Sequence, residues 1–244
     1  MSSAPTVGVL ALQGGVAEHE RMLASLVATP VRVRRPHDLL ALDALVVPGG
    51  ESSVLDRLLD VAGLRASLTD AIRDGLPTLG TCAGLVLLAA TLENPAPGQR
   101  TLGLLDIAVR RNAFGRQVDS AEVEARWLPG TGSPLRAAAI RAPEVTAWGE
   151  GVEVVSTMTV ASADGSARDA VVGVRQGSVT AISLHPELTG DPTAHLALLE
   201  GQRSWTSTSK AWVTAGSPTA LAPPPRIPSS SCAGFGKSSG SASL

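Results

Sequence analysis

The chain has 244 residues and a formal net charge of −2 at pH 7. This balance gives no electrostatic reason to expect binding to nucleic acid or to an anionic membrane. No apolar run reaches the roughly 20 residues needed to span a bilayer, and the expected compartment is the cytoplasm. Aromatic residues make up 2% of the chain and tyrosine is absent, so we expect a core of Val, Leu, Ile and Ala.

The first half of the chain alternates apolar strands with amphipathic helices joined by short connections. Residues 6–12 are continuously apolar, which is typical of a parallel strand covered on both faces. Further strands are expected at 31–34, 44–47 and 76–81, and helices at 16–27, 53–59 and 64–74. This alternation predicts an α/β fold: a doubly wound, mostly parallel sheet with helices on both faces. In such a sheet the ligand lies beyond the carboxyl ends of the strands.

The second half contains a series of short strands, which we expect to form an antiparallel extension of the sheet. They are expected at residues 102–110, 135–140, 152–155, 158–162, 170–176 and 179–184. A helix is expected at 191–200, with Asp191 as its N-cap and Pro192 at its first position. We assign residues 1–202 to one domain, and we expect residues 203–244, rich in Ser, Pro and Gly, to form a flexible tail.

The most informative segment runs from residue 76 to residue 89, where an apolar strand enters Gly-Thr-Cys-Ala-Gly and a helix follows directly. This pattern is typical of a nucleophile elbow, in which Gly80 and Gly84 allow strand and helix to approach closely and Cys82 is raised above the sheet. The N–H of Ala83 then lies beside the nucleophile as an oxyanion donor. The segment alone fits a buried structural cysteine equally well. The other cysteine, Cys232, lies in the expected tail, so a disulfide between the two is not expected.

A nucleophilic cysteine needs a base and a group that orients the base. Of the four histidines, His185 follows a strand-like run and is separated from Glu187 only by the rigid Pro186. Cys82, His185 and Glu187 together are the candidate catalytic triad. No pattern of metal ligands accompanies them.

The segment from Pro48 to Ser53, Pro-Gly-Gly-Glu-Ser-Ser, is the second candidate for the site. Two glycines before a helix expose backbone N–H groups that suit an oxyanion or a carboxylate. The same segment also fits an ordinary helix entry with Ser52 as its cap. Its expected place at the same edge of the sheet as Cys82 favours the functional interpretation.

The elbow and the His-Pro-Glu segment resemble the class I (triad) glutamine amidotransferases. Five motifs are similar in particular to the glutaminase subunits of pyridoxal 5′-phosphate synthase, and they follow one another in order between about residue 6 and residue 200. They are Ala-Leu-Gln-Gly at 11–14, Pro-Gly-Gly-Glu-Ser at 48–52, Arg-Asn-Ala-Phe-Gly-Arg-Gln at 111–117, Ile-Arg-Ala-Pro at 140–143 and His-Pro-Glu-Leu-Thr at 185–189.

The resemblance implies hydrolysis of L-glutamine to L-glutamate and ammonia through a thioester on Cys82, with His185 as base and then acid and Glu187 as its orienting carboxylate. It places the oxyanion between the N–H of Ala83 and an N–H of the Gly49-Gly50 loop. It also implies a set of residues that hold glutamine: Gly50, Glu51, Ser52, Arg111, Ile140 and Arg141. An arginine suits the substrate carboxylate because its planar fork grips both oxygens.

The resemblance further implies a partner, a TIM-barrel synthase subunit that takes up the ammonia and builds pyridoxal 5′-phosphate from a pentose phosphate and a triose phosphate. The two subunits would form a hetero-oligomer, with Gln13 and Gly14 at the interface and with the glutaminase weakly active until the synthase docks. The chain itself would need no cofactor, since pyridoxal 5′-phosphate is the product of the partner.

Two alternatives stay open from the sequence. A cysteine peptidase or other cysteine hydrolase of similar fold would also use an elbow cysteine and a histidine, although it would give the Gly-Gly-Glu-Ser loop no role. The second alternative is an amidotransferase-like module that binds or regulates without turnover. Against it, all three residues of the candidate triad are present.

Overall fold

The computed structural model describes residues 4–114, 121–130, 132–161 and 165–203. The expected tail after Arg203, including Cys232, lies outside the described residues, as do Gly115, Arg116 and Gln117 of the third amidotransferase-like motif. The domain boundary at residue 202 therefore stays a prediction.

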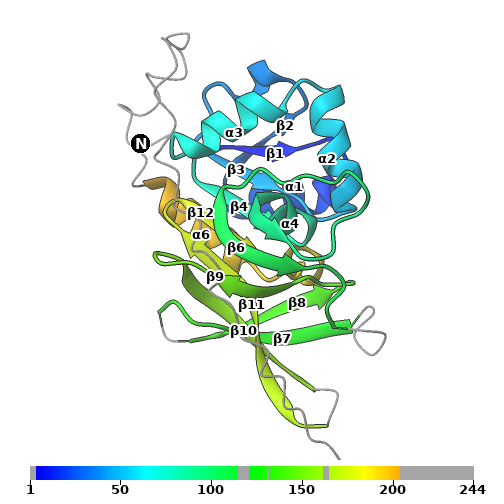
Figure 1. Ribbon diagram of the computed structural model, residues 1–244. Coiled ribbons are helices and arrows are strands. Elements are labelled where there is room, and N and C mark those ends of the chain that lie inside the picture. The colour runs from blue at the N-terminus through cyan, green and yellow to red at the C-terminus, as the bar shows by residue number, and fades with distance from the viewer. Residues whose placement is uncertain (1–3, 115–120, 131, 162–164, 204–244) are drawn as a thin grey trace, which may run out of the picture.

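Parallel strands form the first half of the sheet (Figure 1). Their order is β2 (Thr29–Val33), β1 (Thr6–Leu10), β3 (Ala44–Val47), β4 (Thr78–Thr81) and β12 (Val179–Ile182). The chain reaches β12 only after passing through the whole second half. That return places the segment after β12 beside the segment after β4, so the two carboxyl ends that carry His185 and Cys82 are neighbours.

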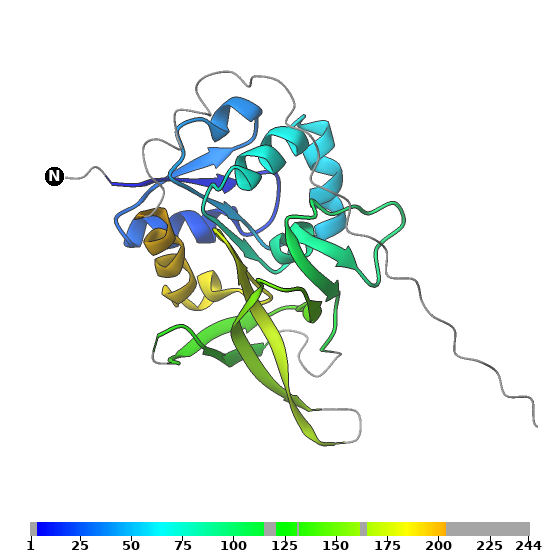
Figure 2. The same ribbon diagram turned by 60° about the vertical axis from the view of Figure 1, so that its left-hand side comes forward.

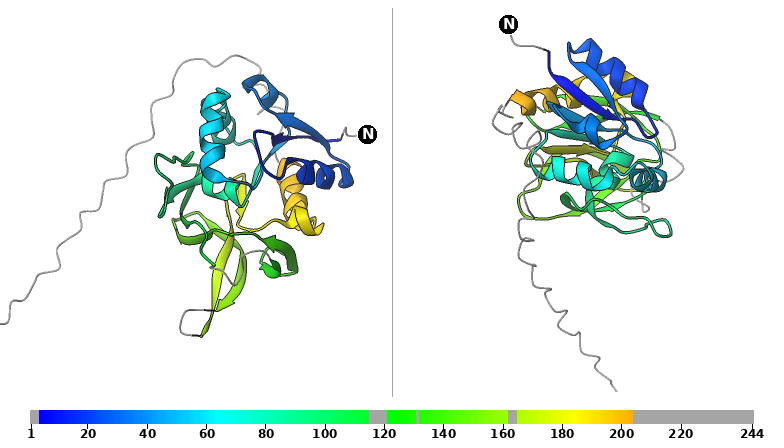
Figure 3. Two further views of the ribbon diagram at one scale, coloured as in Figure 1. Left: turned by 90° about the vertical axis from the view of Figure 1, so that its right-hand side faces the viewer. Right: turned by 90° about the horizontal axis from the view of Figure 1, so that it is seen from above.

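Helices cover both faces of this parallel sheet (Figures 2 and 3). One face packs against α1 (Val16–Ser25) and α6 (Thr193–Arg203), and the other against α2 (Ser52–Val61), α3 (Arg65–Arg73) and α4 (Ala83–Leu88). Successive residues of a strand point to opposite faces. Val46 of β3 accordingly packs in the same cluster as Leu23 of α1, while the next residue, Val47, packs in the same cluster as Leu55 of α2. Burial on both faces explains why the strands are continuously apolar.

Antiparallel strands extend the sheet beyond β12. They follow in the order β11 (Ala167–Gln176), β10 (Glu153–Ala161), β7 (Ala121–Trp127) and β8 (Pro134–Ala139). A branch leaves β11 through β9 (Glu144–Trp148), which pairs with β6 (Leu105–Arg110), and β6 pairs in parallel with β5 (Ala89–Leu92). The predicted fold class, a doubly wound α/β sheet with an antiparallel extension, is confirmed.

The structure corrects several element boundaries. The two strands expected at 152–155 and 158–162 are the single strand β10, in which the register to β11 shifts around Val155. The sequence analysis missed β5, β7, β9 and the 3-10 helix η1 (Pro36–Leu39). The last helix begins at Thr193 instead of residue 191, so Pro192 precedes it, although Asp191 Oδ1 does accept the N–H of Thr193 at 2.9 Å.

The strand expected to end near His185 ends at Ile182, and His185 is instead the residue before a short helix, α5 (Pro186–Thr189). Backbone hydrogen bonds with Ala138 on β8 hold His185 in both directions, at 2.9 and 3.1 Å. None of the helices among the described residues is long and apolar enough to cross a membrane.

Candidate active site

Cys82 lies in a strained turn between β4 and α4. Its φ of 46° and ψ of −100° place an L-residue in a conformation that costs free energy and is found mainly at functional sites. The turn requires glycine at Gly84, because an added Cβ would collide with the carbonyl oxygen of Val47. At Gly80 an added Cβ would lie 2.6 Å from Leu88 Cδ1. The predicted strand–turn–helix geometry of a nucleophile elbow is therefore present.

The structure brings Cys82, His185 and Glu187 together. Their exposed fractions are 8%, 8% and 7%, and His185 Nδ1 lies 2.8 Å from Glu187 Oε1. A proton on Nδ1 that points to the carboxylate leaves Nε2 as the ring nitrogen available to the Cys82 sulfur. Gly49 packs against both His185 and Cys82, since an added Cβ at Gly49 would collide with the His185 ring and lie 3.2 Å from Cys82 Cβ.

The pKa of His185 is raised to about 10. Burial acts in the opposite direction and lowers it, but hydrogen bonds and electrostatic attraction to Cys82 and Glu187 more than offset the burial. His185 therefore holds its second proton at neutral pH, beside the sulfur of Cys82.

Two further histidines, His19 and His195, are fully buried, and His19 faces the carboxylate of Glu187. His19 Nδ1 lies 2.9 Å from His195 Nε2, while His19 Nε2 lies 3.1 Å from Thr81 Oγ1 and 3.5 Å from Glu187 Oε1. Burial lowers the pKa of His19 well below its usual value, and the nearby imidazoles of His195 and His185 lower it further. Burial also lowers the pKa of His195, to about 4. Both rings are therefore neutral at pH 7.

The proton positions on this histidine pair follow from the charge of Glu187. A lone pair on His19 Nε2 would face the carboxylate, so the neutral ring carries its proton on Nε2 and points it at Glu187 and Thr81. Its Nδ1 then accepts from His195 Nε2. This arrangement leaves an acceptor atom, His195 Nδ1, as the ring nitrogen without a hydrogen-bond partner among the described residues. Sequence analysis missed these two residues, because no motif accompanies a histidine in the interior of a helix.

The Gly49-Gly50 loop is held by hydrogen bonds that fix the direction of its peptide groups. The N–H of Gly49 donates to Thr81 Oγ1 at 2.9 Å, and the carbonyl of Gly49 accepts from the N–H of Gly15 at 3.2 Å. A trans peptide directs its N–H opposite to its carbonyl, so the N–H of Gly50 points away from the Gly14–Gly15 turn. The expectation that Gly49 itself donates to an oxyanion is wrong here, since its N–H is already bonded to Thr81.

Gln13 joins the same loop from the other side. Its Oε1 accepts from the N–H of Glu51 at 3.2 Å, and its Nε2 donates to the carbonyl of Glu51 at 3.3 Å. Gly14 has a φ of +88°, and an added Cβ there would collide with the Gly49 carbonyl oxygen. The Gln13-Gly14 turn and the Gly49–Glu51 loop therefore form one interlocked unit.

These elements enclose a cavity of about 240 Å³. It gathers the predicted residues from six separate segments, namely Gly14, Gly49, Gly50, Glu51, Ser52, Cys82, Ala83, Arg111, Ile140, Arg141, His185 and Glu187. The lining also includes Gly15, Val86, Asn112, Pro143 and Leu188, to which the sequence analysis gave no role. Asn112, Pro143 and Leu188 lie inside the amidotransferase-like motifs, so those motifs could have indicated that these three residues line the cavity. A cavity of this size suits one small molecule.

Arg111 and Arg141 bring positive charge to this cavity. In the described part of the chain, neither guanidinium lies within ion-pair distance of a carboxylate. Arg141 has a φ of +45° and Asn112 a φ of +51°, so both chain segments turn sharply at the wall of the cavity. A small molecule with a carboxylate at one end and an electrophilic carbon at the other fits this distribution of groups.

Comparison with known proteins gives the family. Residues 9–199 match the SNO glutamine amidotransferase family. A relative from Cutibacterium acnes, described as pyridoxal 5′-phosphate synthase subunit PdxT, is 53% identical over 192 residues that cover 79% of this chain and 94% of the relative. A protein of the same description from Corynebacterium glutamicum strain R is 50% identical, with 79% and 94% covered.

Solved structures agree with this result. One described as a glutamine amidotransferase superposes with a TM-score of 0.71 at 41% identity, covering 81% of this chain and 98% of that chain. A putative GMP synthase subunit from Thermoplasma acidophilum shares the fold, with a TM-score of 0.59 at 18% identity and coverage of 86% and 100%. The chain matches the family over most of its length, and the relatives are about half identical to it over the aligned residues. It therefore belongs to the SNO glutamine amidotransferase family.

Proposed function

We propose that the chain hydrolyses the side-chain amide of L-glutamine and supplies the ammonia to the synthase subunit of pyridoxal 5′-phosphate synthase. The observation that carries the proposal is the buried set of Cys82, His185 and Glu187, which lines a small cavity together with Arg111 and Arg141, two arginines that pair with no carboxylate among the described residues. The relatives named above are amidotransferases or synthase subunits by description. They give no support to the alternatives of a cysteine peptidase or an inactive module.

The proposed reaction is an acyl transfer in two halves. The sulfur of Cys82 attacks the amide carbon, and His185, which holds a proton at neutral pH, gives that proton to the departing ammonia. A water molecule then attacks the thioester, His185 takes a proton from it, and glutamate leaves. Glu187 accepts the Nδ1 proton of His185 throughout, which fixes the ring and stabilises its charge.

The negative oxygen that develops in each half needs fixed donors. Ala83 is the first residue of α4, so its N–H has no acceptor within the helix. The N–H of Gly50 is the second proposed donor, because the anchored Gly49 carbonyl directs it away from the Gly14–Gly15 turn. The substrate would be held by Gly50, Glu51, Ser52, Ile140, Arg111 and Arg141.

The rim of the cavity supports docking of a TIM-barrel synthase at this face. Gly14 and Gly50 are exposed there, and Leu188, also part of the lining, leaves 47% of its surface exposed. A partner that covers this rim would touch the Gln13-Gly14 turn, which bonds directly to the Gly49–Glu51 loop. Docking would thereby steady the proposed oxyanion donor, and it would exclude water from the ammonia.

The test is a mixing assay with the synthase subunit that pairs with one of the relatives. Glutamate release from glutamine should rise when the synthase is added, and Cys82→Ala should abolish it while its unfolding midpoint stays near that of the wild type. Glutamine hydrolysis by Cys82→Ala at the wild-type rate would contradict the proposal. Hydrolysis of peptides without turnover of glutamine would contradict it as well.

A further inference from the structure

The loop of residues 93–100, between β5 and β6, lies outside the cavity but contacts two residues of its wall. Neither the family resemblance nor the lining of the cavity singles out this loop. Its residue Gln99 bridges the side chains of Ser52, the first residue of α2, and Arg111, which follows β6.

All the polar atoms of the Gln99 side chain are used in this bridge. Its Oε1 accepts from Arg111 Nη1 at 2.5 Å and from the N–H of Ala96 at 3.1 Å, and its Nε2 donates to Ser52 Oγ at 2.9 Å. A side chain with donor and acceptor ends satisfied in this way has one preferred orientation. It therefore fixes where the Arg111 guanidinium and the Ser52 hydroxyl lie.

The backbone of Arg111 is fixed by the same loop. Asn94 Oδ1 accepts its N–H at 2.7 Å, and Asn94 Nδ2 donates to its carbonyl at 3.1 Å. Arg111 is thus held at both ends by neutral amides. No carboxylate compensates its charge in the part of the chain that the structure describes.

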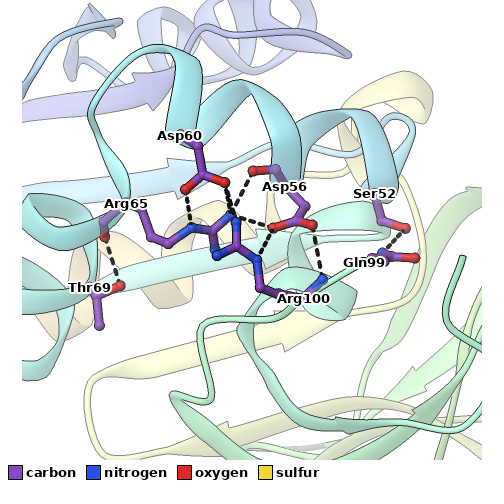
Figure 4. A network of polar contacts seen from close by, with 7 residues as sticks. All are labelled: Ser52, Asp56, Asp60, Arg65, Thr69, Gln99 and Arg100. Carbon is purple, nitrogen blue, oxygen red and sulfur yellow. Dashed lines mark hydrogen bonds and ion pairs between the residues drawn. The ribbon is translucent and has the colours of Figure 1, made fainter. Parts of the chain in front are cut away.

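The loop is itself fastened to α2, the helix that begins with Ser52 (Figure 4). Asp56, which is 2% exposed, accepts the backbone N–H of Arg100 at 2.9 Å and pairs with the side chain of Arg65. Asp60, one turn further along α2, pairs with the side chains of Arg65 and Arg100. The loop that carries Gln99 therefore cannot shift relative to Ser52 without breaking the hydrogen bond from the Arg100 N–H to the buried Asp56 carboxylate and the exposed ion pair between Arg100 and Asp60.

From this geometry we infer that Gln99 is a positioning residue that sets the preference of the site for a substrate carboxylate. It orients Arg111 through a carbonyl oxygen, which leaves the positive charge uncompensated for the α-carboxylate of glutamine. A carboxylate at the same place would keep the hydrogen bond but neutralise the arginine. The inference rests on the proposed glutaminase function and adds a residue outside the cavity to its specificity.

The test compares Gln99→Glu and Gln99→Met in complex with the synthase. Two substrates are used, glutamine and its analogue with a carboxamide in place of the α-carboxylate. Gln99→Glu should raise KM for glutamine about tenfold or more with kcat changed less than about twofold, which corresponds to the loss of one charged contact. Turnover of the analogue should stay near its wild-type value, so the preference for glutamine falls. Gln99→Met, which removes the hydrogen bonds without adding charge, should give a smaller rise in KM.

Gln176→Met serves as the matched control, because Gln176 accepts the N–H of Asp106 and does not line the cavity. Calorimetric binding of glutamine to Cys82→Ala, with and without Gln99→Glu, provides a readout that needs no turnover. If both Gln99 variants hydrolyse glutamine and keep the wild-type KM and the wild-type affinity for glutamine, the inference about Gln99 is overturned and the proposed function is not. A loss confined to kcat would overturn it too. Absence of glutamine turnover in the wild-type complex would instead contradict the proposed function.

Discussion

The imidazole of His19 faces the carboxylate of Glu187 in the interior of the protein, with 3.5 Å between Nε2 and Oε1. The same Nε2 lies 3.1 Å from Thr81 Oγ1, which accepts the N–H of Gly49. One buried ring thus contacts both the carboxylate of the proposed triad and the threonine that holds the Gly49-Gly50 loop. Glu187 Oε2 has no hydrogen-bond partner among the described residues. The contact with His19 is therefore important for stabilising the carboxylate of Glu187.

The first prediction concerns the proton on His19 Nε2. In His19→Gln the amide nitrogen reaches about the same place as Nε2, so kcat should stay within a few-fold of the wild type. In His19→Leu that donor is lost, and kcat should fall about tenfold or more, the equivalent of one hydrogen bond of about 1.4 kcal/mol. Steady-state kinetics with the synthase bound measures both. His37→Gln, at an exposed position on η1, is the control and should behave like the wild type. Equal losses in His19→Gln and His19→Leu would contradict a role for the donor.

The second prediction concerns stability in acid. The folded-state pKa of His195 is lowered to about 4, and that of His19 lies well below 6.5. As the pH falls below 6.5, the unfolded chain binds protons that the folded chain refuses, so the free energy of unfolding falls between pH 6.5 and about 4. The limiting slope is about 1.4 kcal/mol per pH unit for each histidine. Urea unfolding should show a shallower fall in His195→Phe, and a slope identical to that of the wild type would count against this assignment.

The third prediction has the opposite sign and concerns His185. Its folded-state pKa is raised to about 10, so its contribution to stability is fully present below pH 6.5 and is lost as the pH rises toward 10. The difference in unfolding free energy between the wild type and His185→Gln should therefore be largest near pH 6 and should shrink above pH 7. Urea unfolding at a series of pH values measures this difference. A difference that grows with pH would show that the imidazole is not held in its charged form.

The elbow and the site motifs could be predicted because their signals are local. Gly80, Cys82 and Gly84 indicate a strand–turn–helix geometry within five residues. Pro186 separates His185 from Glu187, so these three residues also form a local signal. The parallel strands were predictable as well, since burial on both faces leaves an unbroken apolar run such as that of β3. Several of their boundaries moved by one or two residues, because the last residues of a run depend on which neighbours they pair with.

Other features depend on partners far away in the sequence. The N–H of Gly49 is taken by Thr81, 32 residues further on, and nothing in either segment indicates that contact. Gln99 lies in a loop without a motif, so its bridge between Ser52 and Arg111 is visible only in the structure. Strand β5 was missed because it follows the last residue of α4 directly, without a turn between helix and strand.

The fourth prediction tests the close approach of β3 and α4 at the elbow. In Gly84→Ala the added methyl group would collide with the Val47 carbonyl, so the free energy of unfolding should fall by about 1–3 kcal/mol. Gly201→Ala in α6 is the matched control, since an added Cβ there meets no atom of the described residues within 4 Å. That control should leave stability unchanged or raise it by up to about 1 kcal/mol, because alanine favours a helix. Urea unfolding distinguishes the two, and equal stability of Gly84→Ala and the wild type would contradict the tight elbow.

The most direct test of the proposed function follows the amide nitrogen of glutamine into the product of the complex. The wild-type chain, the synthase subunit, its two sugar phosphates and glutamine labelled with nitrogen-15 at the amide are incubated with excess unlabelled ammonium. Mass spectrometry then measures the label in pyridoxal 5′-phosphate. We expect pyridoxal 5′-phosphate that carries the label despite the ammonium, and only unlabelled product when the chain is Cys82→Ala. Unlabelled pyridoxal 5′-phosphate from the wild-type complex would contradict the claim that this chain supplies the nitrogen.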